Sequence, residues 1–109
     1  MKLVNLTPHT INWYKQNGEV IEIPSSGLLR CKVESKLQEA IDGLQIYRNT
    51  YSFEDVLPEE EQGTYYIVSS IVANAVKELK LDRNDIIVVN DSVRDENGRI
   101  IGCKSFARI

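Results

Sequence analysis

Hydrophobic and polar residues alternate along residues 10–15 and again along residues 19–23. Alternation with a period of two is typical of half-buried β-strands. Asn17-Gly18 lies between the two segments, and an Asn-Gly pair readily adopts the positive φ angles that a two-residue hairpin turn requires. The pattern therefore predicts a β-hairpin whose core-facing side chains are Ile11, Trp13, Ile21 and Ile23.

Further strands are expected on both sides of this hairpin. Short apolar, aromatic or β-branched runs predict them at residues 2–6, 28–35, 45–53, 64–68 and 86–91. A second Asn-Gly pair, Asn97-Gly98, predicts another hairpin that ends in the last strand. Residues 36–44 fit either one short helical turn or an irregular crossing, and the acidic residues 54–63 fit a solvated loop, which is expected to be the most mobile segment.

One segment changes from the period of strands to the period of a helix. Ile71, Ala75 and Leu79 recur at helical spacing after Ser69 and Ser70, either of which is a good N-cap. We therefore expect one principal helix at about residues 69–80.

The order of these elements predicts a single α+β domain over residues 1–109, with a mainly antiparallel twisted sheet and this one helix. One helix cannot cover both faces of such a sheet. The uncovered face is expected to be polar, curled on itself, or buried against another subunit, so a homo-oligomer is a reasonable expectation.

Composition narrows the classes of function. The net charge of −3 argues against binding of extended nucleic acid, which usually needs a strongly basic surface. No apolar run approaches the ~20 residues of a membrane-spanning helix, and the N-terminus becomes polar too early for a signal peptide. Cys31 and Cys103 form no CxxC pair, which favours two free thiols over one disulfide and indicates a cytoplasmic protein.

The segment "NLTPH" is the first candidate for chemistry. Asn5, Thr7 and His9 could bind a ribose or a phosphate, because they offer amide, hydroxyl and imidazole groups. The alternative is a turn whose side chains satisfy nearby backbone groups. His9 is the only histidine, so one chain cannot build a two-histidine metal site or a two-histidine phosphodiesterase.

The segment "YIVSSIV" is the second candidate. Free amides at a helix N-terminus attract anions, and the hydroxyls of Ser69 and Ser70 could add to such a site. The alternative is that the serines only cap the helix, since no Gly-rich loop and no Walker lysine accompany them.

Arginines form the third group of candidates. Arg94, Arg99 and Arg108 flank the last hairpin, where they could bind phosphate or make cross-strand salt bridges with neighbouring aspartates. Arg30 follows the turn "PSSG", and turn chemistry does not explain it.

Four spaced segments, "NLTPH", "IPSSG", "GTYYIVSSIVANA" and "VRDENGRIIGC", cover most of the chain apart from residues 36–62. In these segments the chain resembles a group of small proteins encoded by phages, prophages and other bacterial genomes. The resemblance implies a setting and not a mechanism, because the group has no settled enzymatic activity. In that setting we expect an anti-defence protein that sequesters a nucleotide signal, such as a cyclic nucleotide or a cyclic ADP-ribose-like molecule.

The leading hypothesis is therefore a non-enzymatic binder of a small nucleotide-type ligand, without a cofactor or metal. Polar contacts are expected from the residues named above, and a stacking ring from Tyr65, Tyr66 or Trp13, of which Tyr66 is the first choice. Two alternatives remain open. One is a structural or regulatory protein whose sheet face binds another protein, and the other is a small hydrolase or phosphodiesterase with His9 as general base.

Overall fold

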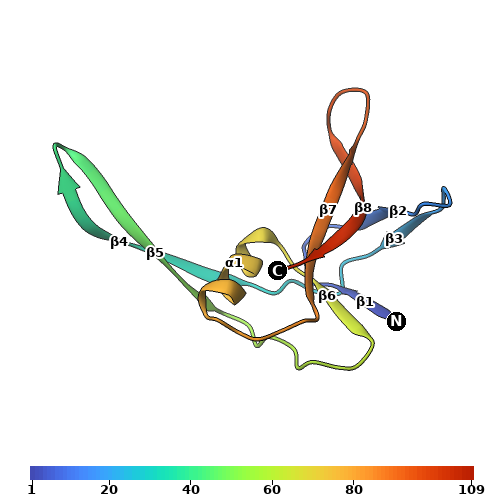
Figure 1. The fold of residues 1–109 in the computed structure, drawn as a ribbon, viewed down its shortest axis with the longest axis horizontal. Helices are drawn as coiled ribbons and strands as arrows, with labels where there is room; N and C mark the ends of the chain where they lie inside the picture. Colours follow the sequence, from blue (N-terminus) through green and yellow to red (C-terminus); the bar gives the residue numbers. More distant parts are fainter.

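The computed structural model describes residues 1–109, of which 51% lie in strands (Figure 1). In chain order the elements are β1 (Lys2–Asn5), β2 (Ile11–Tyr14), β3 (Val20–Ile23), β4 (Cys31–Ile41), β5 (Leu44–Phe53), β6 (Thr64–Ile67), α1 (Ser70–Glu78), β7 (Ile86–Arg94) and β8 (Ile100–Arg108). Six strands form one sheet in the order β1-β6-β7-β8-β2-β3, and β4 pairs only with β5. We call the six-stranded sheet with α1 the body, and the β4–β5 hairpin the arm.

The fold class expected from the sequence is wrong. The protein is mostly β with one short helix, and its main sheet is mixed and nearly closed instead of mainly antiparallel. Strand β1 pairs with β6, β6 with β7, and β2 with β8 in parallel, whereas β2–β3 and β7–β8 are antiparallel. Alternation of apolar and polar residues identifies a strand but does not specify which strand it pairs with or in which direction. The parallel pairs could therefore not be predicted from the sequence.

Asn5 brings the two edges of the main sheet together. Its carbonyl oxygen accepts from the Ser26 backbone N–H at 2.8 Å, and its side-chain amide donates to the Ile23 carbonyl at 2.9 Å. The segment after β3 therefore returns to the end of β1, where Asn5 and Ser25 form a parallel bridge. Of the three expected arrangements of the uncovered sheet face, the structure has the sheet curled on itself.

Alternate side chains of the strands enter two separate apolar clusters. Ile23, Ile67 and Ile87 form one buried cluster, against which Trp13 and Phe106 pack from neighbouring strands. The other cluster lies under α1 and contains Leu29, Tyr66, Val68, Val72, Ala73, Val76 and Ile86. The curled sheet thus encloses one cluster and presents the other to the helix.

The local turn signals agree with the structure at both Asn-Gly pairs. Asn17-Gly18 joins β2 to β3 and Asn97-Gly98 joins β7 to β8, with both glycines at positive φ. The β7–β8 hairpin extends beyond the rest of the sheet, at the top of Figure 1.

The helix is shorter than the expected residues 69–80. Its last turn closes with two bonds: the Leu81 N–H donates to the Val76 carbonyl, and the Lys80 N–H donates to the Lys77 carbonyl. This is the Schellman arrangement, which needs a left-handed residue after the helix. Lys80 takes that conformation with φ +54°, and because glycine usually occupies the position, the sequence offered no stop signal there.

Residues 36–44 form neither a helical turn nor an irregular crossing. They continue β4 to Ile41, turn at Asp42-Gly43, and begin β5. Asp-Gly is a hairpin signal of the same kind as Asn-Gly, but the good helix formers before it obscured the signal. The arm projects from the body (Figure 1), which explains a radius of gyration of 16.7 Å, against about 13 Å for a compact chain of this length.

The structure also bears on the expectations about membrane-spanning helices and about the two cysteines. None of the helical segments is both long and apolar enough to cross a lipid bilayer. Cys31 and Cys103 are free thiols, half-buried and buried respectively. Burial raises the pKa of both thiols, so both are held in the protonated form more strongly than an exposed cysteine.

Candidate functional site

A groove of about 980 Å³ lies between α1, strands β2, β7 and β8, and the turn after β1. We call it the helix groove. Four of the site residues expected from the sequence line it, and they come from two distant segments: Thr7 and His9 from the turn, Ser69 and Ser70 from the start of α1. The fold therefore brings the first two candidate segments together.

Asn5 builds the turn that carries two of these residues. Its side-chain amide donates to the His9 carbonyl at 2.7 Å, and its side-chain oxygen accepts from the Thr7 backbone N–H at 3.0 Å. The side chain is completely buried, so Asn5 positions the turn and does not reach the groove. The His9 ring is exposed and has no hydrogen-bond partner in the chain, because both bonds at His9 go to its carbonyl oxygen.

The start of α1 contributes hydrogen-bond donors to the groove. Ser69 is the N-cap, and its hydroxyl accepts from the Val72 N–H at 3.3 Å. The next two amides, those of Ser70 and Ile71, have no acceptor within the chain. Unpaired amides at a helix N-terminus carry partial positive charge and are suited to an anion.

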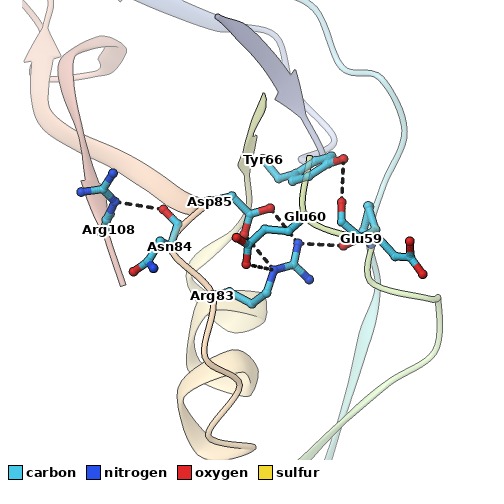
Figure 2. Close-up of polar contacts among 8 residues, drawn as sticks. Glu59, Glu60, Tyr66, Arg83, Asn84, Asp85 and Arg108 are labelled. Atoms are coloured by element: carbon cyan, nitrogen blue, oxygen red, sulfur yellow. Dashed lines mark hydrogen bonds and ion pairs between the residues drawn. The ribbon is translucent and has the colours of Figure 1, made fainter. Parts of the chain in front are cut away.

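The two charged side chains that line the helix groove, Lys77 and Arg108, are both basic. Lys77 and Arg108 line it together with His9, and no aspartate or glutamate does, although the chain as a whole has a net charge of −3. Arg108 donates through Nε to the Asn84 carbonyl at 2.9 Å, which fixes the guanidinium and leaves its terminal nitrogens free (Figure 2). The local charge of the groove is thus opposite in sign to that of the protein.

The floor of the helix groove is apolar. Val89, Ile100 and Ile101 line it and remain partly uncovered, with Ile100 61% exposed. An apolar floor beside a few convergent polar groups is the usual composition of a small-molecule site, and the volume lies at the upper end of the range for such sites.

The expected stacking rings lie elsewhere. Trp13 and Tyr65 line a second groove of about 830 Å³ with Phe106, and we call it the aromatic groove. The rings of Trp13 and Phe106 meet edge to face, with 6.0 Å between centroids and 70° between planes. The two grooves share one lining residue, Arg108.

Tyr66 and Arg30 do not line either groove. Tyr66 is buried under α1, and its hydroxyl donates to the Glu59 carbonyl at 3.3 Å (Figure 2). Arg30 binds Asp55 through Nε at 3.1 Å and through its backbone N–H. The hydrogen bonds from Arg30 lower the pKa of the Asp55 carboxyl below its usual value. Both residues therefore have intramolecular partners in the segment that follows β5.

That acidic segment is tethered at a third point by Arg83. Its guanidinium makes two bonds to the buried Asp85 carboxylate, at 2.7 and 2.8 Å, and one bond of 2.7 Å to the Pro58 carbonyl (Figure 2). Contact with Asp85 raises the pKa of Arg83 above its usual value. The loop expected to be mobile is therefore held to both β6 and the start of β7.

Arg94 and Arg99 lie in the distal β7–β8 hairpin and line neither groove. Arg94 donates to the Gly98 carbonyl at 2.6 Å, and the Arg99 backbone N–H donates to the Asp95 carboxylate at 2.9 Å. The structure thus separates these two arginines from Thr7 and His9, while Arg108 on the same hairpin reaches the groove.

Sequence reasoning missed two groove residues on the helix. Asn74 and Lys77 line the helix groove with Ser70, and the spacing of 70, 74 and 77 places the three on one helical face. This polar stripe was the available signal.

Comparisons of this chain with protein-family models, with curated proteins and with solved structures find no match. The helix groove offers hydroxyls, amides and the cations Lys77 and Arg108 over an apolar floor, and it holds no carboxylate that could orient the His9 ring as a general base. Such an arrangement is suited to holding an anionic molecule.

Proposed function

We propose that the protein binds a small anionic ligand of nucleotide type in the helix groove and holds it without chemical change. The observation that carries this proposal is the absence of acidic side chains from a groove with Lys77, Arg108 and His9, in a chain of net negative charge. A site that excludes carboxylates while the remaining surface is rich in them favours anions over neutral or cationic molecules.

The parts of the groove correspond to the parts of a nucleotide. The unpaired amide of Ser70, which lines the groove, and that of Ile71 next to it suit a phosphate oxygen, and Lys77 and Arg108 supply neutralising charge. The His9 ring nitrogens suit ribose hydroxyls, and the Thr7 hydroxyl oxygen can accept from one while its hydrogen is donated to the Asn5 side-chain oxygen at 2.6 Å. The exposed apolar floor suits the face of a base.

Retention without turnover fits a protein that sequesters its ligand. In a phage or prophage setting, the ligand would be a nucleotide signal of a defence system, such as a cyclic nucleotide or a cyclic ADP-ribose-like molecule. Sequestration requires charge-assisted contacts to the anionic groups and no activated nucleophile. The His9 ring has no acidic partner to activate it, which favours binding over hydrolysis.

The test is retention and recovery of the ligand. The purified protein is incubated with a panel of cyclic nucleotides and ADP-ribose derivatives, separated from free ligand, heated, and the released molecule is identified by chromatography. Recovery of one panel member intact supports the proposal. Recovery of an altered product, or of nothing from the whole panel, contradicts it.

Matched lysine variants locate the ligand. Lys77 lines the helix groove and Lys104 lines the aromatic groove, so each substitution to alanine removes one exposed positive charge. We expect Lys77→Ala to weaken retention about tenfold, as for the loss of one charge-assisted contact, and Lys104→Ala to leave it unchanged. The reverse result would place the ligand in the aromatic groove.

Ser70→Glu separates binding from folding. A glutamate in the first turn of a helix stabilises the helix through its dipole, but here it also places a carboxylate in the groove. We expect unchanged or higher thermal stability together with loss of ligand retention. Retention equal to that of the wild type would show that the helix N-terminus takes no part in binding.

A further inference from the structure

The arm presents an apolar face that nothing in the chain covers. At its base, Cys31 and Phe53 pack against the cluster under α1. Further out on the same face lie Val33, Leu37 and Tyr47, which are 43%, 53% and 52% exposed. The arm projects from the body there, at the left of Figure 1. A two-stranded hairpin without a covered face is only marginally stable in water.

Both outer edges of the arm are also unpaired. β4 and β5 form a two-stranded sheet, and neither pairs with a strand of the body. β4 is an edge strand of 11 residues with a bulge between Leu37 and Glu39, and its regular stretch from Cys31 to Leu37 is a template for pairing with another chain. Another strand beside the arm would satisfy the unpaired edge, and it would also give the exposed apolar side chains of β4 apolar neighbours on the same face.

We propose that this strand is β4 of a second copy of the chain, paired antiparallel about a two-fold axis at Ser35. The sequence "VESKL" around Ser35 is complementary to its own reverse. In this register Val33 lies opposite Leu37 of the second copy, and Glu34 lies opposite Lys36. The two-fold axis repeats each of these pairs, giving two apolar and two oppositely charged cross-strand pairs.

The charges of the arm are available for this pairing. Lys36 has no acidic partner within the chain, and Glu34 makes only an exposed contact of 3.2 Å with Lys32. Such exposed pairs are weak and exchange readily. A second copy would therefore give Lys36 a partner that the single chain does not supply.

The edge of β5 is a poorer candidate for the same role. Antiparallel pairing about Asn49 would place Tyr47 opposite Tyr51 of the second copy, but Arg48 would lie opposite Thr50. Arg48 would then gain no carboxylate. Charge complementarity thus selects β4 over β5.

Pairing through β4 would produce a four-stranded sheet from two arms. The apolar faces of the two arms become continuous across the new strand pair, because directly opposite residues point to the same side of a sheet. In this register Cys31 lies opposite Glu39 of the second copy, so each tip extends past the start of β4 in the other copy. Exposed Ile41 and Leu44 at the tip would lie beside the partner body.

Single cysteines test the axis directly. Residues at the two-fold axis of an antiparallel pair have Cα atoms about 4.5–5.5 Å apart, within the range of a disulfide. Ser35→Cys should give a disulfide-linked dimer on mild oxidation. Asn49→Cys is the matched control, since it lies at the axis of the rival β5 pairing, and it should remain monomeric on denaturing gels. Wild-type protein oxidised in parallel shows how much disulfide-linked dimer forms through the native Cys31.

Charge reversal tests the pairing of Glu34 with Lys36 of the second copy without introducing a disulfide. Glu34→Lys places lysine opposite lysine, and we expect it to weaken the dimer at least about tenfold in sedimentation experiments. The double variant with Lys36→Glu restores opposite charges and should restore the dimer. Circular dichroism of each variant verifies that the body remains folded.

Three results would overturn the proposal. The first is a wild-type protein that sediments as a monomer at every concentration up to the millimolar range. The second is cross-linking through Asn49→Cys but not through Ser35→Cys. The third is a dimer that both single charge reversals leave unchanged. Ligand retention in the helix groove is measured separately, and its outcome does not affect this test.

Discussion

The body and the arm are built from the same alternating pattern, yet they bury it to different degrees. In the body, alternate residues of β6 and β7 enter one or the other of two apolar clusters. In the arm, every residue from Lys32 to Thr50 except Ile46 is exposed. The difference shows that the alternating pattern specifies which side chains can be buried. Whether they are buried depends on other elements of the fold packing against them.

Closure of the body depends on a small number of contacts. Asn5 ties β1 to the segment after β3 and is fully buried, and α1 covers the outer face. The arm has no equivalent of either, apart from its base against α1. The comparison predicts large effects of substitutions in the body and small effects of substitutions in the arm.

The largest expected effect is that of Asn5→Ala. The substitution removes the side-chain bonds to Thr7, His9 and Ile23 and leaves buried groups without partners, at a cost of about 3–5 kcal/mol. Chemical denaturation measures the change. Asn49→Ala in the arm is the control and should cost less than about 0.5 kcal/mol. Equal losses of stability in the two variants would contradict the expected difference between the body and the arm.

Gly102→Ala is expected to have the next largest effect. A Cβ atom at Gly102 would lie 2.5 Å from the Asn12 carbonyl oxygen and against the Tyr14 ring, so β2 and β8 would have to separate. Strain of this kind typically costs about 1–3 kcal/mol. Thermal unfolding measures it, and a variant as stable as the wild type would show that β2 and β8 are less closely packed.

Removal of the arm should have a small effect on the body. Val33 and Tyr51 are cross-strand partners, so an Asn-Gly turn can replace residues 34–50. None of those residues is buried, and we expect the free energy of unfolding to change by less than about 1 kcal/mol. The shortened chain should keep its ligand retention and lose its dimer. Failure of this chain to fold would mean that the arm contributes to the body core.

The smallest expected effect is a pH-dependent one at the base of the arm. Because Arg30 lowers the pKa of Asp55, the ionised pair stabilises the folded state above the unfolded pKa of about 3.9, and this contribution is lost as the pH falls through the folded value. The melting temperature of the wild type should therefore fall more than that of Arg30→Ala between pH 7 and pH 3. Parallel pH curves for the two proteins would show that the pair contributes no measurable stability.

Local signals predicted the parts of the fold that local chemistry determines. The turns at Asn17-Gly18 and Asn97-Gly98 and the N-cap at Ser69 follow from the conformational preferences of those residues. The parallel pairs and the closure at Asn5 join segments far apart in the chain, and no local preference encodes them. The Asp42-Gly43 turn could have been predicted from the sequence, but the helix formers that precede it suggested a short helical turn instead.

The candidate site, like the fold, was predictable only in its local parts. Thr7, His9, Ser69 and Ser70 were selected one segment at a time, and the fold places all four around one groove. Their convergence depends on the packing of α1 against β7, which no local preference in the sequence encodes. The functional role of these residues, and of Arg30, Tyr66, Arg94 and Arg99 outside the groove, stays a prediction.

The central claim is that an anionic nucleotide-type ligand occupies the helix groove. An NMR titration of the ¹⁵N-labelled protein with the panel of cyclic nucleotides and ADP-ribose derivatives tests it most directly. We expect one panel member to shift the backbone amides of Ser70, Ile71 and the Thr7–His9 turn, with saturation and without any change in the ligand spectrum. No shift with any panel member, shifts confined to Trp13 and Tyr65, or new ligand signals from turnover would contradict the claim.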